Sequence, residues 1–303
     1  MSTAAQALPR DRTEPLSSTP SPKFLGAVGG ELLKLSRQRA TWVMLGFAVL
    51  LFAVAIGAII SAPDIRTQLH RDPRGWYSEL LNIFTSFFNA GAGIFLLIVS
   101  ARLVGMEYSA GTIRVLLGRG TGRLTLLGAK LVTLALTGLA LLAGFLIVAT
   151  IAVYLMVVSW EGSFSPIASL PSVWHDLGLE VLIASISIGI NILLGTAAAV
   201  VGRSLAFGIG AALAFYPADN FGTLVMNLVF RLTHQQIWND VTAYLLGPNL
   251  NVLQSLLIPG QRAAFAQPLV AVDARHTLIV VGVYAAVFLI GSIVLMIRRD
   301  VLQ

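Results

Sequence analysis

Residues 131–160 read LVTLALTGLALLAGFLIVATIAVYLMVVSW, an apolar stretch that contains no Asp, Glu, Lys, Arg or His. A helix needs about 20 such residues to cross the hydrocarbon core of a bilayer. Four further stretches share this character, at residues 40–63, 80–101, 181–202 and 277–297. With 56% hydrophobic and 11% charged residues, the chain has too little polar surface to cover a water-soluble globule of 303 residues. The sequence therefore predicts an all-α integral membrane protein.

A sixth apolar stretch, residues 204–230, is interrupted by Pro217 and Asp219. In a continuous helix, Asp219 would lie about 22 Å beyond Ser204, in the outer third of a hydrocarbon core about 30 Å thick. One interpretation is that Asp219 faces the bundle interior or water at a functional site. The other is that Pro217 ends the helix early and Asp219 caps the next segment in the outer headgroups. With this stretch included, six transmembrane helices are predicted, at about residues 41–62, 80–102, 131–157, 179–202, 204–228 and 277–297.

The basic residues are distributed unevenly about these six spans. One side holds 14 of the 20 Lys and Arg residues and a net charge of +9, whereas the other side has a net charge of −3. Because Lys and Arg favour the cytoplasmic side, both termini are predicted to be cytoplasmic, in a multi-pass protein of the cell (inner) membrane. The basic residues are split among short segments, so membrane lipid is the expected partner and nucleic acid is not.

The first 39 residues divide into two predicted segments. Residues 1–23 are rich in Pro, Ser and Thr, which predicts a disordered cytoplasmic tail ahead of a transmembrane domain at residues 24–303. Residues 24–39 place an apolar stripe beside Lys34 and Arg37, which is typical of an amphipathic helix on the inner membrane surface. A simple basic anchor is the alternative. The stripe comprises Phe24, Leu25, Val28, Leu32 and Leu35.

The segment between the second and third spans, residues 107–123, reads EYSAGTIRVLLGRGTGR. Ser109 or Thr112 can cap a short helix in which Ile113 and Leu117 share an apolar face, and the glycines that follow would turn the chain back to the membrane. Such a basic amphipathic helix can bind anionic lipid, or it can insert its apolar face into a groove on a soluble partner.

The pattern of residues 107–123, followed by Ala129 and Lys130 at the start of a span, resembles the cytoplasmic loop of ABC-2 type permeases, the membrane subunits of ATP-binding-cassette exporters. In that family the loop forms a coupling helix that docks into the ATPase subunit. One departure is Gly120, where family members often have Pro. The resemblance implies an ATPase-coupling role for Glu107, Tyr108, Gly111, Thr112, Arg114, Arg119 and Arg123.

The resemblance also implies partners and a route. The partners are two cassette ATPase subunits, which bind ATP and Mg, and a second permease subunit in a homodimer or heterodimer. No cofactor is expected on this chain, which is not expected to be an enzyme by itself, because it has no Gly-Lys dipeptide and hence no Walker A loop. In the family the second and fifth spans face the partner permease. The candidate translocation path comprises Phe87, Phe88, Asn89, Phe207, Phe215, Tyr216 and Asp219.

The predicted function is export of a hydrophobic or amphipathic substrate, such as a drug, a lipid or a peptide-like molecule. A secondary transporter or channel without an ATPase is the alternative, and a membrane enzyme has the least support because no catalytic motif is present. No metal site is expected, since the four His lack helical ligand spacing. The apolar stretch 250–258 either re-enters the membrane or forms an outer lid.

Overall fold

The computed structural model describes residues 24–62, 64–112, 122–258, 260–263 and 265–298, and over these residues the chain is helical and contains no strand. The helices are α1 (Phe24–Ser36), α2 (Arg39–Ser61), α3 (Ile65–Arg71), α4 (Pro73–Ser109), α6 (Arg123–Glu161), α7 (Ser165–Ala168), α8 (Val173–Gly202), α9 (Leu205–Thr233), α10 (Ile237–Val241), a 3-10 turn η1 (Thr242–Tyr244), α11 (Leu246–Leu257) and α12 (Ala274–Arg298). The prediction of an all-helical membrane protein is confirmed.

Five of these helices are long and apolar enough to cross a membrane: α2, α4, α6, α8 and α12. Each coincides with a predicted span, but most extend further than their apolar cores. The largest extension is α4, which begins at Pro73 and ends at Ser109, whereas residues 80–102 were predicted. The helix is longer than the predicted span because it continues past the apolar residues at both ends. Asp72 accepts a hydrogen bond from Gly75 N at 2.9 Å and so caps the start of α4.

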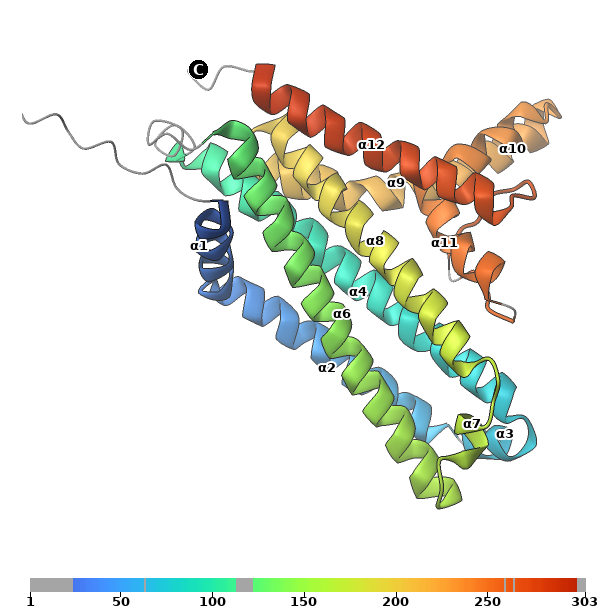
Figure 1. The fold of residues 1–303 in the computed structure, drawn as a ribbon. Helices are drawn as coiled ribbons and strands as arrows, with labels where there is room; N and C mark the ends of the chain where they lie inside the picture. Colours follow the sequence, from blue (N-terminus) through green and yellow to red (C-terminus); the bar gives the residue numbers. More distant parts are fainter. Residues whose placement is uncertain (1–23, 63, 113–121, 259, 264, 299–303) are drawn as a thin grey trace, which may run out of the picture.

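The long helices α2, α4, α6 and α8 run lengthwise in one bundle with two distinct ends (Figure 1). We call the end that holds α1 and the C-terminus of α4 the α1 end, and the opposite end, which holds α3 and α7, the α7 end. α9 leaves the α1 end and runs toward the other side of the molecule, and α12 returns to the α1 end (Figure 1). α9 passes through Pro217 without ending, so the interpretation in which Pro217 terminates the helix is wrong.

The core lies around α4 and α8, which pack together more extensively than any other pair of helices. Leu96, Leu97 and Ile190 are buried there. Gly195 on α8 permits the close approach, because a Cβ atom at this position would lie 2.8 Å from Leu97 O and 2.0 Å from Ser100 Oγ. By contrast, α2 has no buried residue and lies at the edge of the bundle.

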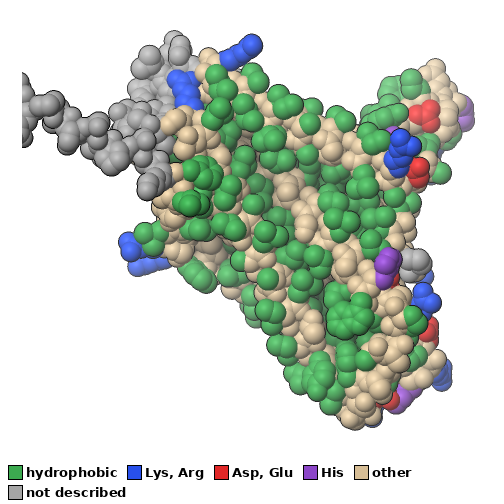
Figure 2. All heavy atoms as spheres, viewed as in Figure 1, with side chains coloured by type: hydrophobic (Ala, Val, Ile, Leu, Met, Phe, Trp, Pro, Cys, Tyr) green, Lys and Arg blue, Asp and Glu red, His purple; other side chains and the backbone are tan. Residues whose placement is uncertain are grey.

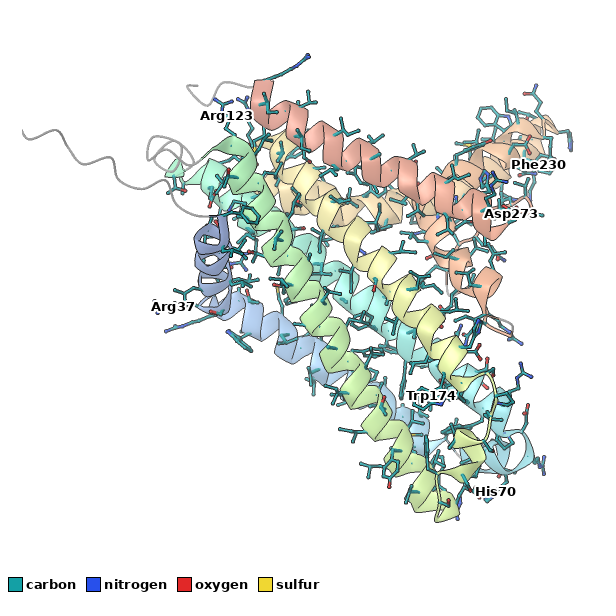
Figure 3. All side chains as sticks on the ribbon, viewed as in Figure 1. Arg37, His70, Arg123, Trp174, Phe230 and Asp273 are labelled. Atoms are coloured by element: carbon teal, nitrogen blue, oxygen red, sulfur yellow. The ribbon has the colours of Figure 1, made fainter. Side chains whose placement is uncertain are left out.

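Apolar side chains cover most of the visible surface (Figure 2). The exposed large side chains include Trp42, Phe47, Ile151 and Val287. Lipid is the solvent that tolerates such a surface. In the same view, Lys and Arg lie at the α1 end, while acidic and His side chains accompany Arg on the opposite side, from the protrusion that holds α10 down to the α7 end (Figure 2). Figure 3 marks the two ends with Arg37 and Arg123 on one side and His70 and Trp174 on the other.

The start of the predicted membrane domain folds differently from the sequence pattern. α1 ends at Ser36, and Arg39 already belongs to α2, so residues 24–39 are not a single helix. In α1, Val28 and Leu35 of the predicted apolar stripe are buried within the protein, whereas Leu25 of the same stripe is 80% exposed and the acidic Glu31 is buried. The apolar stretch 250–258 forms most of α11, which packs against α8, α9 and α12.

Candidate coupling site

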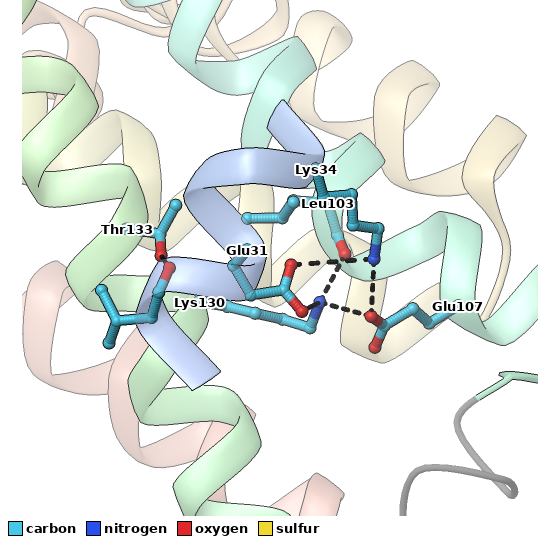
Figure 4. A network of polar contacts seen from close by, with 7 residues as sticks. Glu31, Lys34, Leu103, Glu107, Lys130 and Thr133 are labelled. Carbon is cyan, nitrogen blue, oxygen red and sulfur yellow. Dashed lines mark hydrogen bonds and ion pairs between the residues drawn. The ribbon is translucent and has the colours of Figure 1, made fainter. Parts of the chain in front are cut away.

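Four charged side chains from three helices meet at the α1 end (Figure 4). Glu31 and Lys34 come from α1, Glu107 from α4 and Lys130 from α6. Lys130 Nζ lies 2.7 Å from Glu107 Oε1 and 3.0 Å from Glu31 Oε1. Lys34 Nζ lies 2.8 Å from Glu107 Oε1 and 3.7 Å from Glu31 Oε2. We call these four residues the ion cluster.

The ion cluster is balanced in charge and mostly buried. Lys130 is 1% exposed, Glu107 3% and Glu31 8%. Lys130 also donates to Leu103 O at 2.9 Å, so its three N–H groups have three acceptors. A buried charge is tolerated when it is paired, and the cluster meets this condition with two positive and two negative groups, although Glu31 Oε2 and Glu107 Oε2 accept no hydrogen bond. It therefore holds α1, α4 and α6 in one arrangement.

Helical spacing explains how α1 and α6 bring their charged residues into the ion cluster. In α1, Glu31 lies between the buried Val28 and Leu35 on the face that packs against α6. On α6, Lys130 shares a face with the buried Thr133, whose hydroxyl donates to Val28 O at 3.4 Å. The cluster thus lies in the middle of the contact between α1 and α6.

The last turn of α4 contacts the remaining helices of the α1 end. Ser109 Oγ accepts a hydrogen bond of 3.0 Å from Leu205 N and so helps to cap the start of α9, where Ser204 is the N-cap and accepts from Phe207 N. Gly105 lies so close to Leu205 that an added Cβ atom would be 2.9 Å from its Cα. Tyr108 packs against a buried cluster containing Val200 of α8 and another containing Met296 of α12. A displacement of this turn would therefore reach every major helix at this end except α2.

Arg123, the first residue of α6, binds the end of α12. Its Nη1 donates to the carbonyl oxygens of Met296 and Ile297, both at 3.0 Å. These carbonyls lie in the last turn of α12, where a helix has acceptors without internal partners and a partial negative charge. Arg123 thus joins the helix that follows the 113–121 segment to the last helix of the chain.

The family model described as "ABC-2 family transporter protein" matches residues 27–216. The chain belongs to the ABC-2 transporter family. The match extends from α1 into α9 and includes the whole ion cluster. ABC-2 proteins of this kind are membrane components of ABC transporters and are not catalytic themselves. No curated protein and no solved structure matches the chain.

The seven predicted coupling positions of this ABC-2 protein do not share one environment. Arg114 and Arg119 lie outside the described residues, and Thr112 is exposed. Gly111 follows the end of α4 with φ of +65°, a left-handed conformation that favours glycine. Glu107 and Arg123 turn toward the chain's own helices, as described above, and Tyr108 is half-buried. Contact of any of the seven with an ATPase stays a prediction.

Sequence reasoning missed the partners of Glu107. Glu31, Lys34 and Lys130 were treated as parts of basic or apolar segments. A signal was present, because a single Lys within an apolar helical stretch requires a buried partner of opposite charge. The pairing itself follows only from the packing of α1 against α6. Ser109 or Thr112 was predicted to cap a short helix in the loop; that predicted helix falls on residues 113–121, outside the described residues, and the Ser109 hydroxyl accepts from Leu205 N at the start of α9.

The candidate translocation-path residues do not form one group. Phe88 is buried and stacks on Phe145 of α6 with ring centroids 4.5 Å apart, whereas the neighbouring Phe87 is 46% exposed. Asn89 is half-buried. Phe207 is 51% exposed on α9. The ring of Phe215 lies against Tyr216 and against Phe288 of α12.

Asp219 lies on α9 but caps the start of α11. Its carboxylate accepts hydrogen bonds from the backbone N–H groups of Leu246 and Gly247, the first two residues of α11. A carboxylate at this position satisfies unpaired donors and complements the positive end of the helix dipole. Asp219 is thereby a structural link between α9 and α11. Among the described residues, no group of three or more His, Asp or Glu side chains gathers as a metal would require.

Proposed function

We propose that the chain is the permease subunit of an ATP-driven exporter, in which cassette ATPases act on the 107–123 segment. Membership of the ABC-2 family supports the association with ATPases. The observation that carries the proposal is the ion cluster together with Ser109 and Arg123 on either side of that segment. A force applied to the segment would be transmitted into α4 and α6, and through them into α1, α9 and α12.

The proposed topology has six crossings with both termini in the cytoplasm. α9 is 29 residues long, which corresponds to about 43 Å at 1.5 Å per residue and exceeds the hydrocarbon core. Its start is bonded to Ser109 at the α1 end, and its charged Asp219 is hydrogen-bonded within the protein. The Lys and Arg side chains at the α1 end support a cytoplasmic location for that end (Figure 2).

The proposed complex contains two permease subunits that meet along α9. An exposed stripe runs along this helix at alternating spacings of three and four residues, the pattern of a helix-pairing seam. Its small members would let two helices approach closely within lipid. The stripe comprises Phe207, Gly210, Ala214, Pro217, Phe221, Leu224 and Leu228. A hydrophobic or amphipathic substrate would pass along this interface, which Phe87 of α4 would also line.

Purification of the tagged chain from native membranes in mild detergent tests the proposal. We expect a cassette ATPase to co-purify in stoichiometric amount. Arg114→Glu combined with Arg119→Glu should reduce the bound ATPase at least about tenfold, since a groove that accepts two arginines would then face carboxylates, and like charges at an interface cost several kcal/mol. Arg231→Glu, on an exposed arginine at the end of α9 away from the α1 end, serves as the control.

Two results would contradict the proposal. One is a stable chain without any ATPase that moves solute down an ion gradient, as a secondary transporter does. The other is equal loss of the ATPase in the Arg231→Glu control and in the double variant. A Glu107→Gln variant tests coupling separately from binding. Because Glu107 is buried, this variant should still bind the ATPase, but the permease should stimulate ATP hydrolysis to a different extent.

A further inference from the structure

A cavity of about 150 Å³ lies between α4, α6, α7 and α8, in the half of the bundle nearer the α7 end. Its walls are almost entirely apolar and include Leu80, Phe84, Phe88, Phe145 and Leu142. A cavity of this size and character holds a single aromatic ring or a short alkyl group. Phe88 is the only candidate path residue that lines it.

Glu180 of α8 is one of the residues that line this cavity. The residue is 2% exposed, and its Oε1 accepts a hydrogen bond of 2.6 Å from Gln254 Nε2. Its Oε2 is buried and has no hydrogen-bond partner. Over the described parts of the chain, no Lys, Arg or His forms an ion pair with Glu180. Leaving an acceptor of a buried carboxylate without a hydrogen bond costs free energy. Glu180 Oε2 is therefore an acceptor for which the protein itself supplies no donor.

The surroundings of Glu180 keep the carboxylate in place and add negative charge. Gln254 Nε2 also donates to Thr85 Oγ1 at 2.8 Å, and Thr85 Oγ1 donates to Leu81 O at 2.7 Å. Asp176 lies one helical turn before Glu180 on α8. Two carboxylates on one helix face favour a positively charged group over a neutral donor.

The geometry points to a binding site for compact lipophilic amines, whose hydrocarbon group fills the cavity and whose ammonium group pairs with Glu180 Oε2. The aromatic walls suit such a cation, because ring faces attract positive charge. Thr150 and Trp174, which also line the cavity, are exposed on the outer surface of the bundle, so a ligand has access from the surrounding lipid. The site lies within one subunit and is separate from the α9 stripe.

Binding to this site does not depend on an ATPase, but the further step that the bound amine is exported rests on the proposed function. The test therefore uses the chain alone, reconstituted in lipid nanodiscs. The probe is 3-(4-fluorophenyl)propylamine, followed by fluorine NMR and compared with empty nanodiscs to subtract partitioning. The uncharged analogue 3-(4-fluorophenyl)propan-1-ol has nearly the same shape.

We expect saturable binding of the amine and weaker binding of the alcohol. Glu180→Gln should weaken amine binding at least about tenfold, because it removes a charge-assisted hydrogen bond. Glu79→Gln, on an exposed carboxylate of α4 that does not line the cavity, is the matched control and should leave binding unchanged. Ala149→Phe, which fills the cavity, should abolish binding of both probes, whereas Ala143→Phe on the exposed face of α6 should not.

Several outcomes would overturn the inference. These are amine uptake no greater than that of empty nanodiscs, equal affinity for the alcohol, or equal losses in the Glu180 and Glu79 variants. Binding that survives Ala149→Phe would place the ligand elsewhere. Size-exclusion chromatography and helical circular dichroism establish that each variant is folded, and Ala149→Phe tests the site with Glu180 intact. Co-purification of an ATPase is a separate result, so the site and the proposed function can fail independently.

Discussion

Lys130 donates to Glu107 Oε1 across 2.7 Å, and this contact joins the start of α6 to the last turn of α4. The two residues lie on either side of the 113–121 segment in the sequence. Because both side chains are almost fully buried, the pair fixes the position of α4 against α6 from within the bundle.

Lys130→Met should lower the stability of the chain in detergent by about 3–5 kcal/mol, because it leaves buried carboxylates short of a positive partner. Thermal or denaturant unfolding followed by circular dichroism measures the loss. Lys34→Met should cost less, since the side chain of Lys34 is 36% exposed and water can compensate. Adding Glu107→Gln to Lys130→Met should recover part of the loss. A Lys130→Met protein as stable as the wild type would contradict this account.

Ser109→Ala should cost about 1 kcal/mol, because it removes the side-chain acceptor of Leu205 N at the start of α9, while Ser204 still caps Phe207 N. Hydrogen exchange should become faster at Leu205, whose N–H is bonded to Ser109 Oγ. Ser61→Ala is a suitable control, since the Ser61 hydroxyl donates to Gly57 O within its own helix. Unchanged exchange at Leu205 would show that the contact between α4 and α9 is not a cap.

Gly195→Ala should destabilise the protein, because the added methyl group would meet Leu97 O and Ser100 Oγ where α4 and α8 touch. Overpacking of this kind costs about 1–3 kcal/mol. Gly189→Ala on the same helix should be neutral or stabilising by up to about 1 kcal/mol, since nothing lies within 4 Å of its Cβ position. If the two variants unfold at the same temperature, the close approach of α4 and α8 is not as described.

Phe221→Cys should form disulfide-linked dimers under mild oxidation, if two copies meet along the α9 stripe. The chain contains no natural cysteine, so any disulfide must involve the introduced residue. Phe47→Cys, on the exposed surface of α2, should remain monomeric on a denaturing gel. Cross-linking at residue 47 and not at residue 221 would move the subunit interface from α9 to α2.

Apolar stretches predicted α2, α4, α6, α8 and α12 because a membrane helix must present about 20 apolar residues to lipid, whatever its neighbours are. Helix ends were harder to predict. α4 extends beyond its apolar core at both ends. Asp72 caps its start and Gly111 follows its end in a left-handed conformation, and neither of these signals depends on hydrophobicity. The interruption at Pro217 was read as an alternative helix end, but α9 continues through it.

The sequence by itself determined that the chain is a helical membrane protein of the ABC-2 family, since local composition and a short motif carry that information. Only the tertiary structure decided which charges meet. Glu31, Glu107 and Lys130 lie on three helices, and Asp219 lies 28 residues from the Gly247 N–H that it binds. The unpaired oxygen of Glu180 is likewise visible only once α4, α8 and α11 surround it. Such pairings depend on helix packing, which brings distant residues together without a periodic signature in the sequence.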